Sequence, residues 1–224
     1  MNVEEAPVRS FVAVPLPAAL QTELLGVARR LAGEASRPEP GWSKLGWAKL
    51  GWAKLRWAKK AENLHVTMKF LGPATPARLG ALTTELIQEV SARPAFTAAV
   101  RGIGAFPEPA HATVIWAGVE DATGALREVA ASVDAAAARV GFTREDRPFR
   151  PHVTLGRCKR GVDVRPLLAS WSGRRAPAPV GAPASDQVGV FTVDALHVYE
   201  SRLGGDGSTY LLRGRAPFGA ARAA

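Results

Sequence analysis

The sequence predicts an α+β protein built from two similar halves. Short apolar segments typical of strands alternate with segments whose apolar residues recur at helical spacing. The pattern His, apolar residue, Thr, apolar residue occurs once in each half, at 65–68 and at 152–155. The chain has 224 residues, of which 47% are hydrophobic and 22% charged, so it can bury a core without disulfides.

The first expected strand covers residues 8–17, where Pro15 and Pro17 end an apolar run. An amphipathic helix follows, and Gly33 is expected to stop it. Its inward stripe is Leu20, Leu24, Val27 and Leu31.

The next strand is expected at 64–72. Thr75 then provides a helix cap and Pro76 the first helical position. Strands at 96–104 and 112–119 follow as an antiparallel pair joined by a Pro-containing turn. The helix that begins at Pro76 is expected to bury Leu79, Leu82, Leu86 and Val90.

A third helix is expected from 123 to 140, with Gly141 ending it and Leu126, Val129, Val133 and Val140 facing inward. A strand at 149–157, entered through Pro151, carries the second motif. The Pro-, Gly- and Ser-rich stretch 172–186 indicates a surface loop. Two last strands, 190–203 and 208–218, are expected to flank a GGDG turn.

Bulk composition favours an anionic partner. The net charge is +9 and the pI is about 10.4, although six of the positive charges lie in or beside the repeat described next. Cys158 is the single cysteine, and the N-terminus has acidic residues where a secretory signal would be basic. We therefore expect a cytoplasmic location, no membrane anchor and nucleic acid as the leading partner.

Four near-identical Trp-Lys pentapeptides occupy residues 41–60. A five-residue period gives no coherent apolar stripe in a helix or a strand, so we expect a mobile or marginally ordered loop inserted at about 38–58. Two functional alternatives stay open. Trp and Lys together suit single-stranded nucleic acid, and the same composition suits an anionic membrane surface.

The two motifs are the strongest functional signal. Side chains alternate faces along a strand, so His65 and Thr67 emerge together, as do His152 and Thr154. One such pair by itself is more often structural. Two copies in matching contexts predict that two imidazoles and two hydroxyls meet on one polar surface. Metal binding is less expected, because the two histidines lack further ligands.

Such a surface suits hydrolysis of a cyclic phosphodiester, which needs a base for water and an acid for the departing sugar oxygen. With ordinary pKa values near 6.5, one imidazole is expected to be neutral and the other protonated near neutral pH, giving a bell-shaped rate profile. The threonines would donate to phosphate oxygens. The scheme needs no metal and no cofactor.

These segments together resemble the two-histidine (2H) phosphoesterases, and most closely the RNA 2′,3′-cyclic phosphodiesterases formerly called 2′-5′ RNA ligases (the LigT-like group). The similar segments are RSFVAVPLP, ENLHVTMKFLG, VIWAGV, RPFRPHVTLGR and LHVYESRL, which span nearly the whole chain. The resemblance implies one bilobal α+β domain over 1–224, with pseudo-twofold symmetry. Two antiparallel sheets would line a central cleft, with helices outside.

By motif position, the resemblance implies that His65 donates a proton to the 3′ oxygen and that His152 accepts one from water. Thr67 and Thr154 would bind phosphate. Arg157 matches a family arginine near the phosphate, although strict strand alternation would turn it away from the site.

Phe11 is a candidate for base stacking, although a core position suits it better. His111 and His197 do not repeat the motif and are expected to lie outside the site. The implied substrate is RNA or an oligonucleotide with a 2′,3′-cyclic phosphate end, bound by a monomer without a metal. Two alternatives remain: 2′-5′ ligation or its reverse at RNA ends, and an RNA-end binding protein without catalysis.

Overall fold

The computed structural model describes residues 6–36, 52–173, 186–205 and 207–219. Its helices are α1 (Ala18–Ala35), α3 (Pro76–Val90), α4 (Ala125–Arg139) and α5 (Arg165–Gly173), with short 3₁₀ turns η1 (Trp52–Lys54), η2 (Ala61–Asn63) and η3 (Pro109–His111). Its strands are β1 (Val8–Pro15), β2 (Arg56–Trp57), β3 (His65–Ala74), β4 (Phe96–Phe106), β5 (Ala112–Glu120), β6 (His152–Val162), β7 (Gln187–Val193), β8 (Ala195–Gly204) and β9 (Gly207–Pro217).

The predicted α+β fold with two halves is confirmed. The strands follow the order β7-β4-β5-β6-β3-β1-β8-β9, with β2 beside β6, and every pairing between them is antiparallel. The two expected sheets join into one strongly curled sheet, because Val66 of β3 pairs with Val153 of β6. One half contains β1, β3, β8 and β9, and the other contains β4 to β7.

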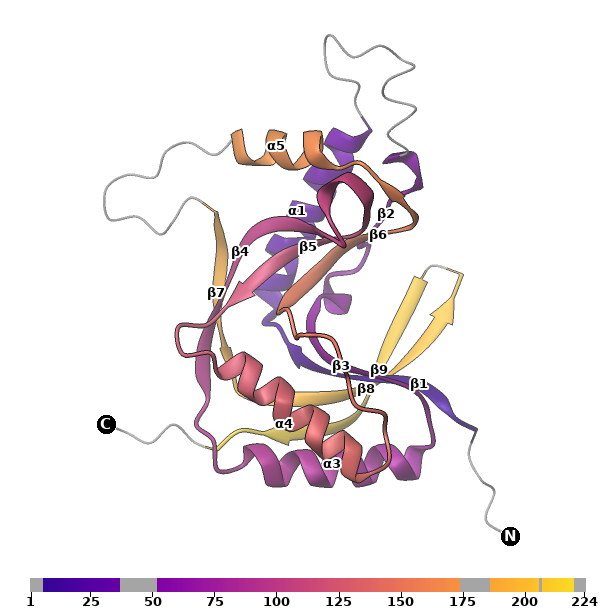
Figure 1. Ribbon diagram of the computed structural model, residues 1–224, viewed down its shortest axis with the longest axis vertical. Coiled ribbons are helices and arrows are strands. Elements are labelled where there is room, and N and C mark those ends of the chain that lie inside the picture. Colours follow the sequence, from indigo (N-terminus) through magenta and orange to yellow (C-terminus); the bar gives the residue numbers. More distant parts are fainter. Residues whose placement is uncertain (1–5, 37–51, 174–185, 206, 220–224) are drawn as a thin grey trace.

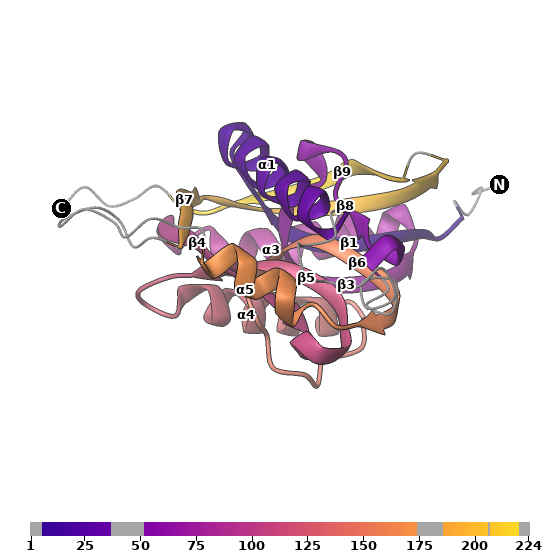
Figure 2. The same ribbon diagram turned by 90° about the horizontal axis from the view of Figure 1, so that it is seen from above.

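The helices are exchanged between the halves. Helix α1 follows β1 but contacts β6 and β7, whereas α4 follows β5 but contacts β3 and α3. Figure 1 shows α3 and α4 together at one end of the molecule and α1 and α5 at the other. The units β1-α1-β3 and β5-α4-β6 thus repeat one topology, which gives the expected pseudo-twofold arrangement. The β8–β9 hairpin projects to one side of the body (Figure 2).

Helix periodicity predicts the core well. Leu79, Leu82, Leu86 and Val90 are all buried, and the Thr75 hydroxyl accepts a hydrogen bond from the backbone N–H of Arg78 at 3.4 Å. The predicted end of α1 at Gly33 is wrong, because the helix continues to Ala35. Ala35 is buried at 4% exposure, and this burial offsets the cost of about 1 kcal/mol for a helical glycine.

Two further predictions need correction near the C-terminus. The strand expected over 190–203 is two strands, because the chain crosses at Asp194 from the edge of one half to the other, where β7 pairs with β4 and β8 with β1. Helix α5 is absent from the sequence-based expectation. The Asp163 carboxylate accepts a hydrogen bond from the Arg165 N–H at 3.0 Å, and Leu167 of the helix is 1% exposed. The sequence signal that was missed is this acidic cap, two residues before the helix begins.

The expectation of a loop is also wrong for the end of the Trp-Lys repeat. Trp52 is 6% exposed and donates from Nε1 to the Asp163 carbonyl at 2.6 Å, while Leu55 is 8% exposed. Trp57 lies on β2 and packs over Gly156. Residues 37–51, which include the first two units of the repeat, lie outside the described residues.

Cys158 is buried at 8% exposure. Among the described residues, no helix has the length and apolar character needed to cross a bilayer.

Candidate active site

The two motifs open the two central strands of the sheet. His65 is the first residue of β3 and His152 the first of β6, and the pair Val66–Val153 joins these strands. Both valines are fully buried, so the histidines and threonines beside them emerge on the opposite face, here called the site face. The antiparallel register places His65 diagonal to His152, and diagonal neighbours are typically about 7–8 Å apart.

Each motif contains a β-bulge directly after its threonine. On β3, Thr67 and Lys69 face successive residues of β1, which leaves Met68 as an extra residue. On β6, Thr154 and Gly156 face successive residues of β5, which leaves Leu155 as the extra one. A bulge of this kind shifts the alternation of the side chains that follow it by one position, up to the next irregularity of the strand.

The bulge on β6 corrects the expectation for Arg157. Strict alternation would place this side chain away from the site, but Leu155 and Gly156 are both buried and Arg157 is exposed. Its guanidinium donates to the Thr154 hydroxyl at 3.3 Å. The structure therefore brings Arg157 together with the second motif.

Both imidazoles are held in the same tautomer. His65 Nδ1 lies 2.9 Å from the Asn63 carbonyl oxygen, and His152 Nδ1 lies 2.7 Å from that of Arg150. A carbonyl only accepts, so Nδ1 carries the proton in each ring and Nε2 is the free base of the neutral form. In both motifs the carbonyl comes from the residue two positions earlier.

His65 sits in an aromatic setting. Its ring stacks on Phe11 with 4.7 Å between centroids, and Nε2 lies 3.1 Å from the Thr67 hydroxyl. Burial lowers the pKa of His65 to about 4, and the positive charge of Arg157, with that of His152 when it is protonated, acts in the same direction.

The pKa of His152 is lowered too, first by burial and then by Arg157. Both shifts favour the neutral form of the imidazoles in the protein without substrate, because desolvation penalises the charged form. The expectation that one imidazole is protonated near neutral pH stays a prediction. An anionic group between them would raise both pKa values again.

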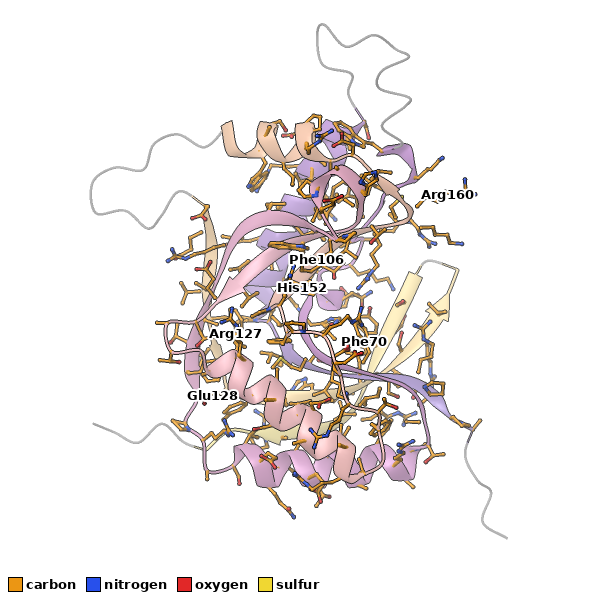
Figure 3. All side chains as sticks on the ribbon, in the orientation of Figure 1. Phe70, Phe106, Arg127, Glu128, His152 and Arg160 are labelled. Atoms are coloured by element: carbon orange, nitrogen blue, oxygen red, sulfur yellow. The ribbon has the colours of Figure 1, made fainter. Side chains whose placement is uncertain are left out.

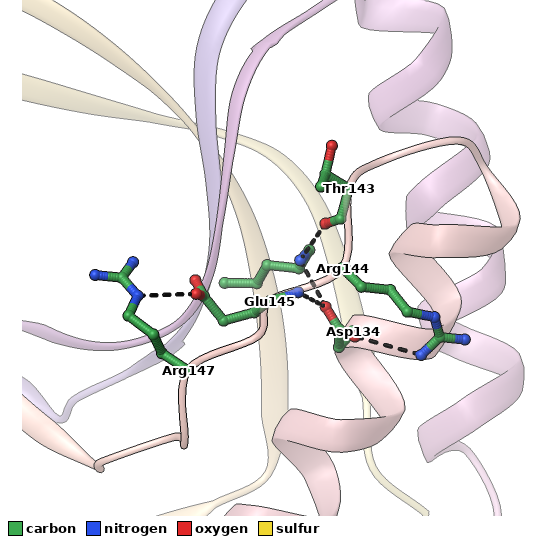
Figure 4. A network of polar contacts seen from close by, with 6 residues as sticks. Asp134, Thr143, Arg144, Glu145 and Arg147 are labelled. Atoms are coloured by element: carbon green, nitrogen blue, oxygen red, sulfur yellow. Dashed lines mark hydrogen bonds and ion pairs between the residues drawn. The ribbon is translucent and has the colours of Figure 1, made fainter.

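Lys69 of β3 forms an ion pair with Asp134 of α4, whose polar contacts Figure 4 shows. Lys69, 6% exposed, donates from Nζ to Asp134 of α4 at 2.6 Å and to the Thr143 carbonyl at 2.8 Å. Asp134 also accepts from the Glu145 backbone N–H at 2.9 Å. Through these contacts, Lys69 of β3 stabilises the segment that connects α4 with His152.

Phe11 does not offer the base-stacking surface proposed for it. It is 4% exposed, because its ring lies between His65 and Tyr199, with Tyr210 edge-on at 4.9 Å. It supports the first imidazole instead. The two tyrosines were missed as site residues, and their only sequence signal was their place in the closing strands.

Phe106 of β4, also missed, contacts the second imidazole edge-on with centroids 5.1 Å apart. Figure 3 shows Phe106 and His152 together in the middle of the molecule. Because Phe106 precedes His152 by 46 positions on a different strand, no local pattern could have paired them.

The other two histidines lie apart from the motifs in sequence and differ in setting. His111 is exposed and contacts Glu108 at 3.1 Å. His197 is half-buried on β8, with Nδ1 2.8 Å from the Tyr199 hydroxyl. Within the described ranges, no three His, Cys, Asp or Glu side chains gather as a group that could hold a metal ion.

The chain is similar in sequence to known proteins. The family model of the 2′-5′ RNA ligase superfamily matches residues 47–205. The RNA 2′,3′-cyclic phosphodiesterase of Archaeoglobus fulgidus is 40% identical over 112 residues, which cover 50% of this chain and 61% of that relative. The protein of the same name from Escherichia coli K12 is 29% identical over 168 residues, 74% of this chain and 81% of the relative.

Solved structures support the fold. A protein of Thermus thermophilus gives a TM-score of 0.65 at 22% identity, covering 95% of this chain and 98% of its own. E. coli LigT in apo form gives a TM-score of 0.64 at 23% identity, covering 96% and 99%. E. coli LigT has also been solved in complex with 3′-AMP.

Proposed function

Because the chain belongs to the 2′-5′ RNA ligase superfamily, we propose that it hydrolyses the terminal 2′,3′-cyclic phosphate of RNA to a 2′-phosphate. The name RNA 2′,3′-cyclic phosphodiesterase, carried by relatives 29% to 40% identical over the matched segments, supports this substrate. The observation that carries the proposal is the pair of imidazoles on one face, each with Nδ1 on a carbonyl and Nε2 left for chemistry.

In the proposed reaction, neutral His152 Nε2 takes a proton from water as its oxygen attacks phosphorus. The bond from phosphorus to the 3′ oxygen breaks, and protonated His65 gives the proton that this oxygen needs. The products are a 2′-phosphate and a 3′-hydroxyl. The acid, the base and the positive charge of Arg157 all come from the chain, so the scheme uses no metal.

The neutral starting state suits substrate binding. A phosphodiester anion on the site face raises the pKa of both imidazoles, so a proton enters the site with the substrate. In neutral His65, Nε2 accepts from the Thr67 hydroxyl at 3.1 Å. Protonation reverses this hydrogen bond, which frees the Thr67 hydrogen for a phosphate oxygen. Arg157 and Thr154 provide donors from the other strand.

The test is incubation with nucleoside 2′,3′-cyclic monophosphates, with and without EDTA, and chromatographic separation of 2′- and 3′-phosphates. We expect 2′-phosphate in both conditions. His65→Ala and His152→Ala should each lower kcat/KM by at least about 100-fold, the usual size of a general acid or base contribution. His111→Ala, which removes an exposed histidine, is the matched control and should keep full activity.

Retained turnover in either variant would reject the acid-base assignment, and 3′-phosphate as the product would reverse the direction of ring opening. Binding of cyclic phosphate ends without turnover would favour the RNA-end binding alternative. Ligation uses the same groups with a 5′-hydroxyl in place of water, so RNA fragments with cyclic-phosphate and 5′-hydroxyl ends separate it from hydrolysis.

A further inference from the structure

Arg56 begins the fourth unit of the Trp-Lys repeat, where the other three units begin with Gly. Its strand, β2, lies beside β6 (Figure 1) and is fixed there by two contacts. Trp57 pairs with Gly156, where a Cβ atom would lie 3.0 Å from the indole, and the Ala58 N–H donates to the Leu155 carbonyl at 2.8 Å. The fold therefore sets the position of Arg56 relative to the second motif.

Arg56 lies directly opposite Arg157. The two are paired residues of antiparallel strands, so their side chains leave the same face of the sheet, which is the site face. The Cβ atoms of such a pair are typically about 4.5–5.5 Å apart. Both side chains are exposed, and the Arg157 guanidinium donates to the Thr154 hydroxyl at 3.3 Å. Two positive charges thus stand beside the second motif.

No carboxylate compensates these two charges. In the described ranges, the ion pairs involve other basic residues, and neither Arg56 nor Arg157 belongs to one. Like charges that are directly opposite each other destabilise a pair of strands. A bound anion removes this repulsion, and the guanidinium group binds phosphate oxygens through two parallel hydrogen bonds. The pair therefore fits a phosphate-bearing ligand.

The place of Arg56 along β6 indicates which phosphate it can reach. Three residue steps separate Thr154 from Arg157, which Arg56 faces, and this is at most about 10 Å of extended strand. In the proposed reaction, Thr154 and Arg157 bind the cyclic phosphate. An RNA end carries a second anion one ribose away, the phosphodiester on the 5′ oxygen of the same nucleotide. A cyclic mononucleotide has no such group.

We propose that Arg56 binds the phosphodiester on the 5′ side of the terminal nucleotide and makes the site selective for RNA ends over cyclic mononucleotides. This inference rests on the proposed function and names its substrate class. Arg157 binds the cyclic phosphate, and the two arginines bind neighbouring phosphates of one strand. The fourth repeat unit then contributes to RNA binding through its arginine, because the Trp57 indole packs over Gly156.

The experiment compares Arg56→Gln with wild type on three substrates. They are adenosine 2′,3′-cyclic monophosphate, the dinucleotide ApA with a 2′,3′-cyclic phosphate end, and the same dinucleotide with a neutral methylphosphonate link. We expect kcat/KM to fall roughly 10-fold for the charged dinucleotide alone, which is the size of one charged hydrogen bond. For this substrate, the slope of log KM against log salt concentration should also fall by about 0.7, as expected for one phosphate contact.

Two further variants test the specificity of this effect. Arg56→Lys keeps the charge and should recover most of the lost kcat/KM. Arg127→Gln is the matched control, because it removes one exposed positive charge from α4, and it should leave all three substrates unchanged. Thermal unfolding of each variant confirms that the fold is retained. A fall of equal size for the monophosphate or the methylphosphonate, or no change on any substrate, would overturn the proposal.

A binding measurement keeps this inference separate from the proposed function. ApA with a 2′-phosphate end and adenosine 2′-monophosphate are titrated into wild type and Arg56→Gln by calorimetry, which requires no turnover. If wild type hydrolyses nothing, the proposed function fails, but a selective loss of dinucleotide affinity in Arg56→Gln still supports the second phosphate site. If wild type binds the dinucleotide no more tightly than the monophosphate, or the variant keeps the difference, the site is rejected.

Discussion

Acidification should destabilise the protein through His65 in particular. The pKa of its imidazole is about 4 in the folded protein, against 6.5 for an ordinary histidine. The unfolded chain therefore binds a proton more readily than the folded chain does. The stabilising contribution is complete above about pH 6.5, falls as the pH drops toward 4, and levels off below that.

The size follows from the two pKa values. Between about pH 7.5 and about pH 4.5, proton linkage at this one group removes about 2.5 kcal/mol from the free energy of unfolding. His65→Gln keeps a side chain that can bond to the Asn63 carbonyl and the Thr67 hydroxyl but does not titrate in this range. On the same acidification, the free energy of unfolding of His65→Gln should therefore fall by about 2.5 kcal/mol less than that of wild type.

The assay is urea unfolding followed by tryptophan fluorescence at both pH values, for wild type, His65→Gln and His111→Gln. The third protein loses one exposed histidine and should follow wild type. If His65→Gln loses as much stability as wild type on acidification, the pKa of His65 is not lowered by folding, and the neutral resting state of the site is wrong.

Three further predictions concern Arg157, Lys69 and Gly104. Arg157→Gln should move the pH profile of kcat/KM toward higher pH, because the positive charge of Arg157 lowers the pKa of both motif histidines. The same variant should raise KM roughly 10-fold, because a charged hydrogen bond is lost. An unchanged pH profile would contradict this reasoning. Lys69→Met should cost about 1–3 kcal/mol in urea unfolding, because the Asp134 carboxylate, 18% exposed, loses its Lys69 partner and keeps Arg144 at 3.4 Å and the Glu145 N–H at 2.9 Å. An unchanged free energy of unfolding would show that the ion pair contributes little. Gly104→Ala should lower the unfolding free energy by about 1–3 kcal/mol, since its Cβ would lie 2.3 Å from the Trp116 ring; an unchanged thermal midpoint would mean that the indole moves freely.

Local sequence patterns were enough to predict most of the helices and strands. The inward stripe of α3 and its Thr75 cap depend only on residues within one or two helical turns, so periodicity and cap chemistry were enough to predict them. The pairing of His65 with Thr67 on one face followed likewise from strand geometry. The end of α1 could not be predicted from local patterns, because Ala35 is buried by contacts that lie outside its own helix.

The sequence by itself determined the two His-x-Thr motifs on strands, the helices between them and the similarity of the two halves. All of these depend on residues that are near one another along the chain. Only the tertiary structure decided the bulges after Thr67 and Thr154, the second of which turns Arg157 onto the site face. Those bulges are defined by the register of strands distant in sequence. The lowered pKa of His65 has the same origin, since burial is a property of the assembled fold.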